Sequence, residues 1–197
     1  YQWTSNPMFT NSCINNVVAG AYTVTVKDVN GCTINAIANI NDIAGPSVAV
    51  TATTAVSCFG GNNGSAVTNI SGGTGTISVL WSHLAQTTPN VTNLPAGLHS
   101  ITITDAAGCV ASTSVQITQP TQLTSAITNV TNVTCSGSNN GSATMLVNGG
   151  TPGYTYLWTP SAQSSSMAVS MGPGTYTCSV TDANGCPTSQ TVTISQP

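Results

Sequence analysis

Charge is the scarcest feature of this sequence. Only 3% of its 197 residues are charged, and the chain contains no glutamate and no arginine. Its one basic residue, Lys27, cannot neutralise a row of phosphates or hold the chain on an anionic membrane, and the formal net charge is −3. We therefore expect no nucleic-acid partner, and hydroxyl and amide groups must provide the solubility.

Long apolar runs and catalytic groups are also missing. No apolar segment approaches the roughly 20 residues of a membrane span, so we expect no membrane insertion. The four aspartates are Asp28, Asp42, Asp105 and Asp182. Three of them share one repeat position, which leaves no paired carboxylates for acid–base chemistry. His99 and Asp105 are about 20 Å apart along one predicted strand, and His83 is expected in a surface loop without a partner.

The turns rich in Gly and Asn offer oxygen ligands for calcium but no carboxylate, so turns are the better interpretation. We predict no catalytic residue, no metal site, no cofactor and no enzyme activity.

Alternating β-branched and polar residues are the main local signal. Segments 22–26 (YTVTV) and 101–104 (ITIT) carry apolar or aromatic side chains at every second position. This is the period of a half-buried strand, and no helical period competes with it. The pattern predicts an all-β protein.

The sequence repeats itself with a period of 77 residues. Positions separated by this period hold the same residue type, and the tryptophans follow within one residue: Asp28, Asp105 and Asp182; Cys32, Cys109 and Cys186; Cys58 and Cys135; Trp3, Trp81 and Trp158. A fixed period of this kind predicts tandem copies of one structural unit.

We place complete units at 47–120 and 121–197, and the carboxyl-terminal part of another unit at 1–46. Regularly spaced strands with turn signals between them predict an antiparallel β-sandwich for each complete unit, arranged head to tail in an extended array. The first unit lacks its two opening strands. We expect these strands to come from residues upstream or from another chain.

The last hairpin of each unit is predicted to have a three-residue loop with glycine in the left-handed region. A three-residue loop, unlike a two-residue turn, puts Ile101, Ile103, Val115 and Ile117 on one face of the sheet. The aspartates then lie at the turn entrance, where a carboxylate can accept hydrogen bonds from turn N–H groups. The structural turn residues are Asp28, Gly31, Asp105, Gly108, Asp182 and Gly185.

Aromatic residues are assigned mainly to the core. Trp3, Trp81 and Trp158 could stack on sugars, but one tryptophan per unit is the usual core anchor of a sandwich. Tyr22 and Tyr176 follow a glycine at the start of a strand, where a tyrosine often caps the backbone.

Three segments carry a family resemblance: 20–32 (GAYTVTVKDVNGC), 135–143 (CSGSNNGSA) and 149–158 (GGTPGYTYLW). Together they resemble the SprB-type repeats of Bacteroidota cell-surface adhesins, which are immunoglobulin-like modules similar to polycystic-kidney-disease domains. The resemblance implies type IX secretion, display as long surface filaments and, in gliding members, a part in adhesion. His99 replaces the tyrosine of the pattern, and Cys178 takes a core position held elsewhere by Val24 and Ile101.

Seven cysteines point to an oxidising compartment. In an immunoglobulin-like sandwich the first turn and the last hairpin turn lie at opposite ends, roughly 25 Å apart, which is too far for a disulfide within one unit. In a head-to-tail array, Cys58 instead approaches Cys186 of the next unit. We therefore hypothesise a ladder of inter-repeat disulfides. Two alternatives remain open, Cys58–Cys109 and Cys135–Cys186, and Cys13 and Cys178 are expected as free thiols or one local bond.

These observations predict a structural repeat segment of an extracellular cell-surface filament or adhesin stalk. Its expected partners are neighbouring repeats of the same chain, with other filament subunits or surface glycans as further possibilities. Two alternatives are a carbohydrate-binding module and a subunit of a laterally assembled sheath or fibre.

Overall fold

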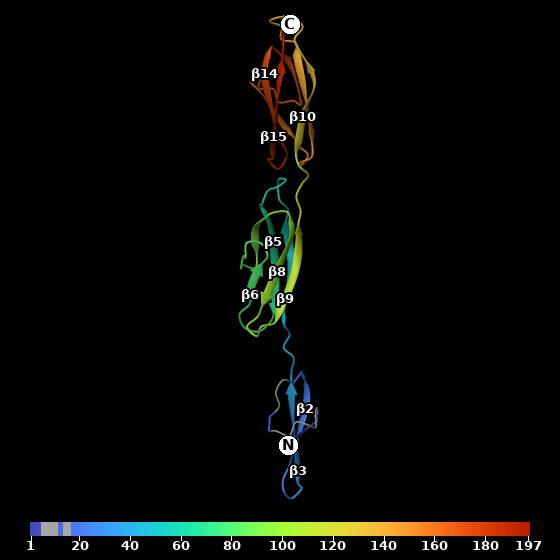
Figure 1. The fold of residues 1–197 in the computed structure, drawn as a ribbon, viewed down its shortest axis with the longest axis vertical. Helices are drawn as coiled ribbons and strands as arrows, with labels where there is room; N and C mark the ends of the chain where they lie inside the picture. The colour runs from blue at the N-terminus through green and yellow to red at the C-terminus, as the bar shows by residue number, and fades with distance from the viewer. Residues whose placement is uncertain (5–11, 14–16) are drawn as a thin grey trace.

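The computed structural model describes residues 1–4, 12–13 and 17–197, and its regular elements are all antiparallel β-strands. Figure 1 shows three groups of strands following one another along the longest axis, with the carboxyl terminus at one end. We call them the amino-terminal unit (β1–β3), the middle unit (β4–β9) and the carboxyl-terminal unit (β10–β15). Among the described residues, no helix is long and apolar enough to cross a membrane.

Short strands of two to nine residues build all three units. The amino-terminal unit contains β1 (Gln2–Trp3), β2 (Gly20–Lys27) and β3 (Thr33–Ile40). The middle unit contains β4 (Pro46–Thr54), β5 (Gly64–Gly72), β6 (Ser78–Trp81), β7 (Val91–Leu94), β8 (Gly97–Thr104) and β9 (Val110–Ile117). The carboxyl-terminal unit contains β10 (Thr124–Thr131), β11 (Gly141–Asn148), β12 (Thr155–Thr159), β13 (Met167–Met171), β14 (Gly174–Thr181) and β15 (Pro187–Ile194).

Two three-stranded sheets face each other in each of the two larger units. The orders are β4-β5-β7 and β6-β8-β9 in the middle unit, and β10-β11-β13 and β12-β14-β15 in the carboxyl-terminal unit. Both units therefore have the same topology, as their sequence similarity requires. They are tandem immunoglobulin-like antiparallel β-sandwiches.

In each of the two larger units, the apolar faces of the two sheets pack against each other around one tryptophan. Trp81 and Trp158 are at most 1% exposed and lie at the centre of the two cores. Cys178 is fully buried beside Trp158, because β12 and β14 place the two residues opposite each other. Tyr176 packs half-buried against the same core.

The last hairpin of the middle unit has the expected three-residue loop. Asp105 N–H donates to the Cys109 carbonyl at 3.0 Å, and Gly108 has a φ of 85°. A glycine suits this loop because a φ in this range is strained for other residues. The register pairs Gly97 with Ile117. Ile101 and Ile103 lie an even number of residues after Gly97 on β8, so Ile117 is on the same face as these two buried residues.

The amino-terminal unit consists of one sheet, in the order β1-β2-β3, among the residues that the structure describes. Trp3 and Tyr22 are buried, whereas Ile34, Ile37 and Ile40 on β3 are exposed. The face that carries Trp3 and Tyr22 corresponds to the core face of the other units.

Candidate functional site at the joint between two units

A disulfide bond joins the middle unit to the carboxyl-terminal unit. Cys58 and Cys186 are bonded with an S–S distance of 2.00 Å and a Cα–Cα distance of 5.7 Å, across 128 residues of sequence. Cys58 lies in the loop after β4, and Cys186 lies directly before β15. Figure 1 shows the turn between β14 and β15 pointing at the end of the middle unit. The joint is thus formed by opposite ends of two similar sandwiches.

Polar contacts support the bond. The Asn184 side-chain amide donates to the Ser57 carbonyl at 3.0 Å, across the joint, and to Thr151 Oγ1 at 2.8 Å, within its own unit. The Cys186 sulfur also lies 3.5 Å from the Ser57 carbonyl. Asn184 therefore ties the orientation of the hairpin to the backbone of the preceding unit.

A small cavity of about 200 Å³ remains beside the disulfide. Its lining residues come from both units: Cys58, Phe59, Gln122, Leu123, Cys186 and Pro187. Phe59 is half exposed there. The lining carries no charged side chain, so this cavity has the character of an imperfectly filled joint.

Asp182 organises the hairpin that presents Cys186. Its Oδ1 accepts hydrogen bonds from the N–H groups of Asn184 and Cys186, each at 2.9 Å. Its Oδ2 accepts from the Thr151 N–H at 2.8 Å, which fastens the hairpin to the Gly149–Thr151 turn. The Thr151 bond is the largest cause that lowers the pKa of the Asp182 carboxyl, because N–H donors stabilise the charged form, although burial acts in the opposite direction.

The middle unit contains the same arrangement around Asp105. Oδ1 accepts from Ala107 N at 3.0 Å and from Cys109 N at 2.8 Å, and Oδ2 accepts from Thr74 N at 2.9 Å. The Thr74 bond is again the largest cause that lowers the pKa of this carboxyl. In the amino-terminal unit, Asp28 Oδ1 accepts from the N–H groups of Asn30 and Cys32, the latter at 2.8 Å.

The sequence pattern indicated only the bonds to the turn itself. The bonds from Thr74 and Thr151 were missed, although each threonine follows a Gly-Gly pair and stands 31 residues before its aspartate.

An asparagine fixes the turn that presents Cys58. Asn63 Oδ1 accepts from Ser57 N at 3.0 Å, and its Nδ2 donates to Ser57 Oγ at 2.8 Å. Gly60 N donates to Gln119 Oε1 at 2.7 Å, which links the turn to the end of the unit. The cysteine on each side of the joint is therefore held by a local hydrogen-bonded frame.

The remaining cysteines are not bonded. Cys13, Cys32, Cys109 and Cys135 are exposed free thiols, and Cys178 is a buried one. Neither alternative pairing, Cys58–Cys109 nor Cys135–Cys186, is formed, because both Cys58 and Cys186 are used in the joint. Burial raises the pKa of the Cys178 thiol, which keeps it protonated and unreactive in the core.

In each unit, the residue two positions after the glycine that opens a strand contacts a backbone carbonyl of the preceding loop through its side chain. Tyr22 and Tyr176 donate their hydroxyls to the carbonyls of Val18 and Gly172, four residues earlier, at 2.7 and 3.2 Å. His99, which replaces the tyrosine in the middle unit, places Nε2 2.9 Å from the Pro95 carbonyl, also four residues earlier.

The expectation that His83 has no partner is wrong. Its ring packs edge-on against His99 with the ring centroids 5.5 Å apart. His83 lies in the loop between β6 and β7, and His99 lies near the start of β8.

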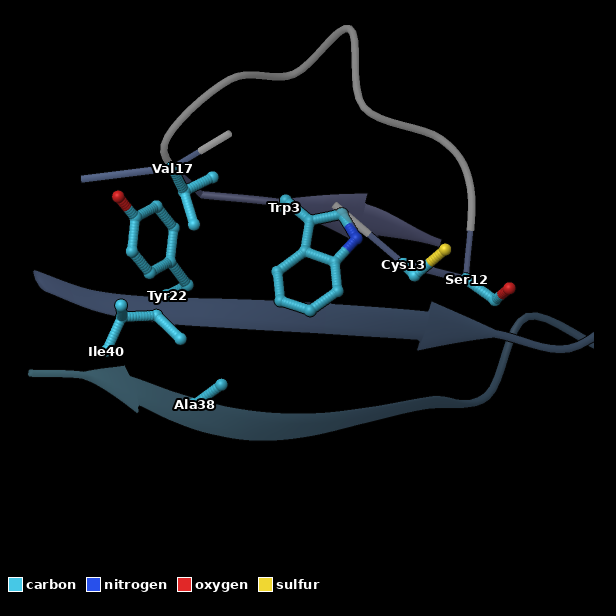
Figure 2. Close-up of a pocket in the computed structure, with 7 residues that line it drawn as sticks. All are labelled: Trp3, Ser12, Cys13, Val17, Tyr22, Ala38 and Ile40. Carbon is cyan, nitrogen blue, oxygen red and sulfur yellow. The ribbon is translucent and has the colours of Figure 1, made fainter. Parts of the chain in front are cut away.

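A second cavity, of about 230 Å³, opens on the amino-terminal unit (Figure 2). Trp3 and Tyr22 project from the sheet into it, Ala38 and Ile40 lie on β3 below, and Cys13 stands at one end. Trp81 and Trp158 occupy the corresponding core positions of the other units. This cavity therefore lies on the face of the sheet that corresponds to the core face of the other units, which favours a core role for Trp3 and Tyr22 over a sugar-stacking platform.

Groups for metal binding do not assemble in the described part of the chain. No cluster of three or more His, Cys, Asp or Glu side chains occurs there.

These features define a class of protein, tandem immunoglobulin-like β-sandwich units joined end to end. Comparison with protein families shows which known repeat these units resemble. The SprB repeat family matches residues 50–86 and 127–163, two stretches that are spaced by the same period of 77 residues. No curated protein sequence matches the chain.

Several solved structures of multidomain proteins are similar in fold. Three domains of the bacteriophage RB49 outer capsid protein Hoc are 14% identical, cover 77% of this chain and 59% of that chain, and give a TM-score of 0.46. The eight N-terminal Ig domains of the cell adhesion molecule DSCAM are 14% identical to this chain. The match covers 90% of this chain and 27% of the DSCAM chain, with a TM-score of 0.43. The chain thus spans little more than half the length of these structures, or less.

Proposed function

We propose that the chain is a structural segment of an extracellular cell-surface filament or adhesin stalk. Each unit contributes length, and the joint contributes stiffness. The observation that carries this proposal is the Cys58–Cys186 bond, which fastens the carboxyl end of one sandwich to the amino end of the next. A covalent joint restricts bending between units and needs no catalytic group.

Three further features support a role outside the cell. A disulfide between folded units persists in an oxidising compartment and is rare in a reducing one. The near absence of charge reduces nonspecific ionic attachment along a stalk. SprB repeats are typical of surface adhesins, and the resemblance supports export by type IX secretion and a part in adhesion and gliding.

The proposal makes the protein structural and without enzyme activity. Its partners are then the neighbouring repeats, with other filament subunits or surface glycans at positions outside the joint.

Immunogold electron microscopy of the source cells, with an antibody raised against this chain, tests the proposal. Label spaced along thin filaments that project from the cell is the expected result. Label confined to a smooth coat favours the laterally assembled sheath, and label found only in the medium, with binding to glycans, favours a carbohydrate-binding module. Either of these results would contradict the proposal that the chain is part of a stalk.

A further inference from the structure

We propose that Cys135 and Cys32 are docking positions for further repeats, each forming the same disulfide that joins Cys58 to Cys186. Cys135 bonds the hairpin cysteine of a following repeat, and Cys32 bonds the first-turn cysteine of a preceding one. The partner is a repeat of this same type, in the same chain or in a second copy. The ladder requires only tandem units, so it holds whether the array is a stalk or a secreted fibre.

The first observation is that Cys135 stands where Cys58 stands, one period later. The frame around it is also the same. Asn140 Oδ1 accepts from Thr134 N at 3.2 Å, and its Nδ2 donates to Thr134 Oγ1 at 2.8 Å, as Asn63 does with Ser57. Gln196 accepts from Ser136 in this turn, and Gln119 accepts from Gly60 in the turn of the middle unit.

The second observation is that Cys32 stands where Cys186 stands. Its N–H donates to Asp28 Oδ1 at 2.8 Å, compared with 2.9 Å for Cys186 and Asp182. The loop glycines have matching φ angles, 89° at Gly31 and 83° at Gly185. The two hairpins therefore present their thiols in the same way.

The contact that orients the existing joint is also available at the new one. Asn184 spans the formed joint by donating to the Ser57 carbonyl, and Asn30 occupies the same place in the hairpin of Cys32. The middle unit has Ala107 there, so its hairpin lacks this donor. Both thiols of the proposed bond are exposed and unbonded. The chain therefore presents an exposed first-turn cysteine, Cys135, and an exposed hairpin cysteine, Cys32. These are the same two parts that form the joint between the middle and carboxyl-terminal units.

Bond formation needs an oxidant, and a small-molecule disulfide such as oxidised glutathione supplies it by exchange. The Cys135 thiolate attacks the oxidant, a mixed disulfide forms, and one glutathione thiolate leaves. The Cys32 thiolate of the partner then attacks the Cys135 sulfur and releases the second glutathione. Two protein thiols lose two protons and two electrons, and the oxidant is reduced to two thiols.

The full chain tests this inference directly. Concentrated protein in a glutathione redox buffer is separated on a non-reducing gel, and the products are digested with a protease that cleaves before aspartate. We expect a series of head-to-tail multimers that reductant converts to monomer, with peptide 28–41, whose only cysteine is Cys32, linked to peptide 105–181. C135S and C32S should each abolish the multimers. C109S, which removes an exposed thiol outside the proposed bond, should keep them.

Three results would overturn the proposal: a chain that stays monomeric, multimers that persist in C135S, or multimers with cysteines paired at random. N30A adds a test of the docking geometry, because a Cys135–Cys32 bond without the Asn30 contact should form more slowly. Multimers formed equally fast by N30A and the wild type would show that the new joint does not copy the existing one.

Discussion

Removal of the Cys58–Cys186 bond is expected to destabilise both sandwiches that it joins. The bond restricts the unfolded chain, and the restriction depends on the length of the loop that it closes. If the carboxyl-terminal unit unfolds while the middle unit stays folded, the closed loop is about 65 residues, which corresponds to about 4 kcal/mol on the chain-entropy estimate. If both units unfold together, the loop spans 128 residues and the estimate rises only to about 5 kcal/mol, because the dependence is logarithmic.

The double variant C58S/C186S measures this effect, and C109S/C135S is a matched control that removes the two equivalent cysteines that are not bonded. Hydrogen exchange followed by mass spectrometry resolves the two units, because each gives its own peptides. We expect the free energy of opening of the carboxyl-terminal unit to fall by about 4 kcal/mol in C58S/C186S, or about 15–30 °C in Tm for a unit of this size. The control should stay within about 0.5 kcal/mol of the wild type, as surface substitutions usually do.

A fall of less than about 1 kcal/mol in C58S/C186S would refute the reasoning, since removal of a native disulfide from a small secreted domain typically costs about 2–5 kcal/mol. An equal fall in the control would also refute it, because the effect would then come from loss of any cysteine at these positions.

Three other predictions address the units themselves. Because the folded-state pKa of Asp182 is lowered, the stability that this carboxylate contributes is present above the unfolded pKa of about 3.9 and is lost as pH falls through the folded pKa. In thermal unfolding, D182N should therefore have a lower Tm than the wild type at pH 7, and the two Tm values should converge in acid. Gly141→Ala should cost about 1–3 kcal/mol by overpacking, because its Cβ would lie 2.7 Å from Ile194 Cγ2 and 2.8 Å from the Met171 carbonyl; an unchanged denaturation midpoint would contradict this. Tyr176→Phe should cost about 0.5–1.5 kcal/mol by removing the bond to Gly172, as denaturant titration would show, and no loss would mean that the cap is replaced by water.

The strands and the last hairpin could be predicted because their signals are local. Alternation with a period of two marks β8 and β9, and parity allows only the loop that keeps Ile101 and Ile117 on one face. The turn position of Asp105 also follows from local sequence, since its Oδ1 partners lie two and four residues away.

The repeat period and an assumed head-to-tail order were enough to predict the Cys58–Cys186 bond, but individual contacts between distant segments could not be predicted from local signals. Thr74 lies 31 residues before Asp105, and the bond between them exists only because two separate turns meet at one end of the sandwich. The Asn184 contact with Ser57 crosses 127 residues and depends on the angle between two units. The packing of His83 on His99 depends on the path of an irregular loop that carries no periodic signal.

The direct test of the central claim, that successive units are joined through their opposite ends, is peptide mapping of the unreduced protein from its source. Cleavage before aspartate separates the candidates, because Cys58 is the only cysteine of peptide 42–104 and Cys186 the only one of peptide 182–197. The account predicts that these two peptides are recovered as one cross-linked species. Peptide 42–104 linked instead to peptide 105–181, which holds Cys109, Cys135 and Cys178, would mean that Cys58 is not bonded to Cys186, and the end-to-end joint would be contradicted.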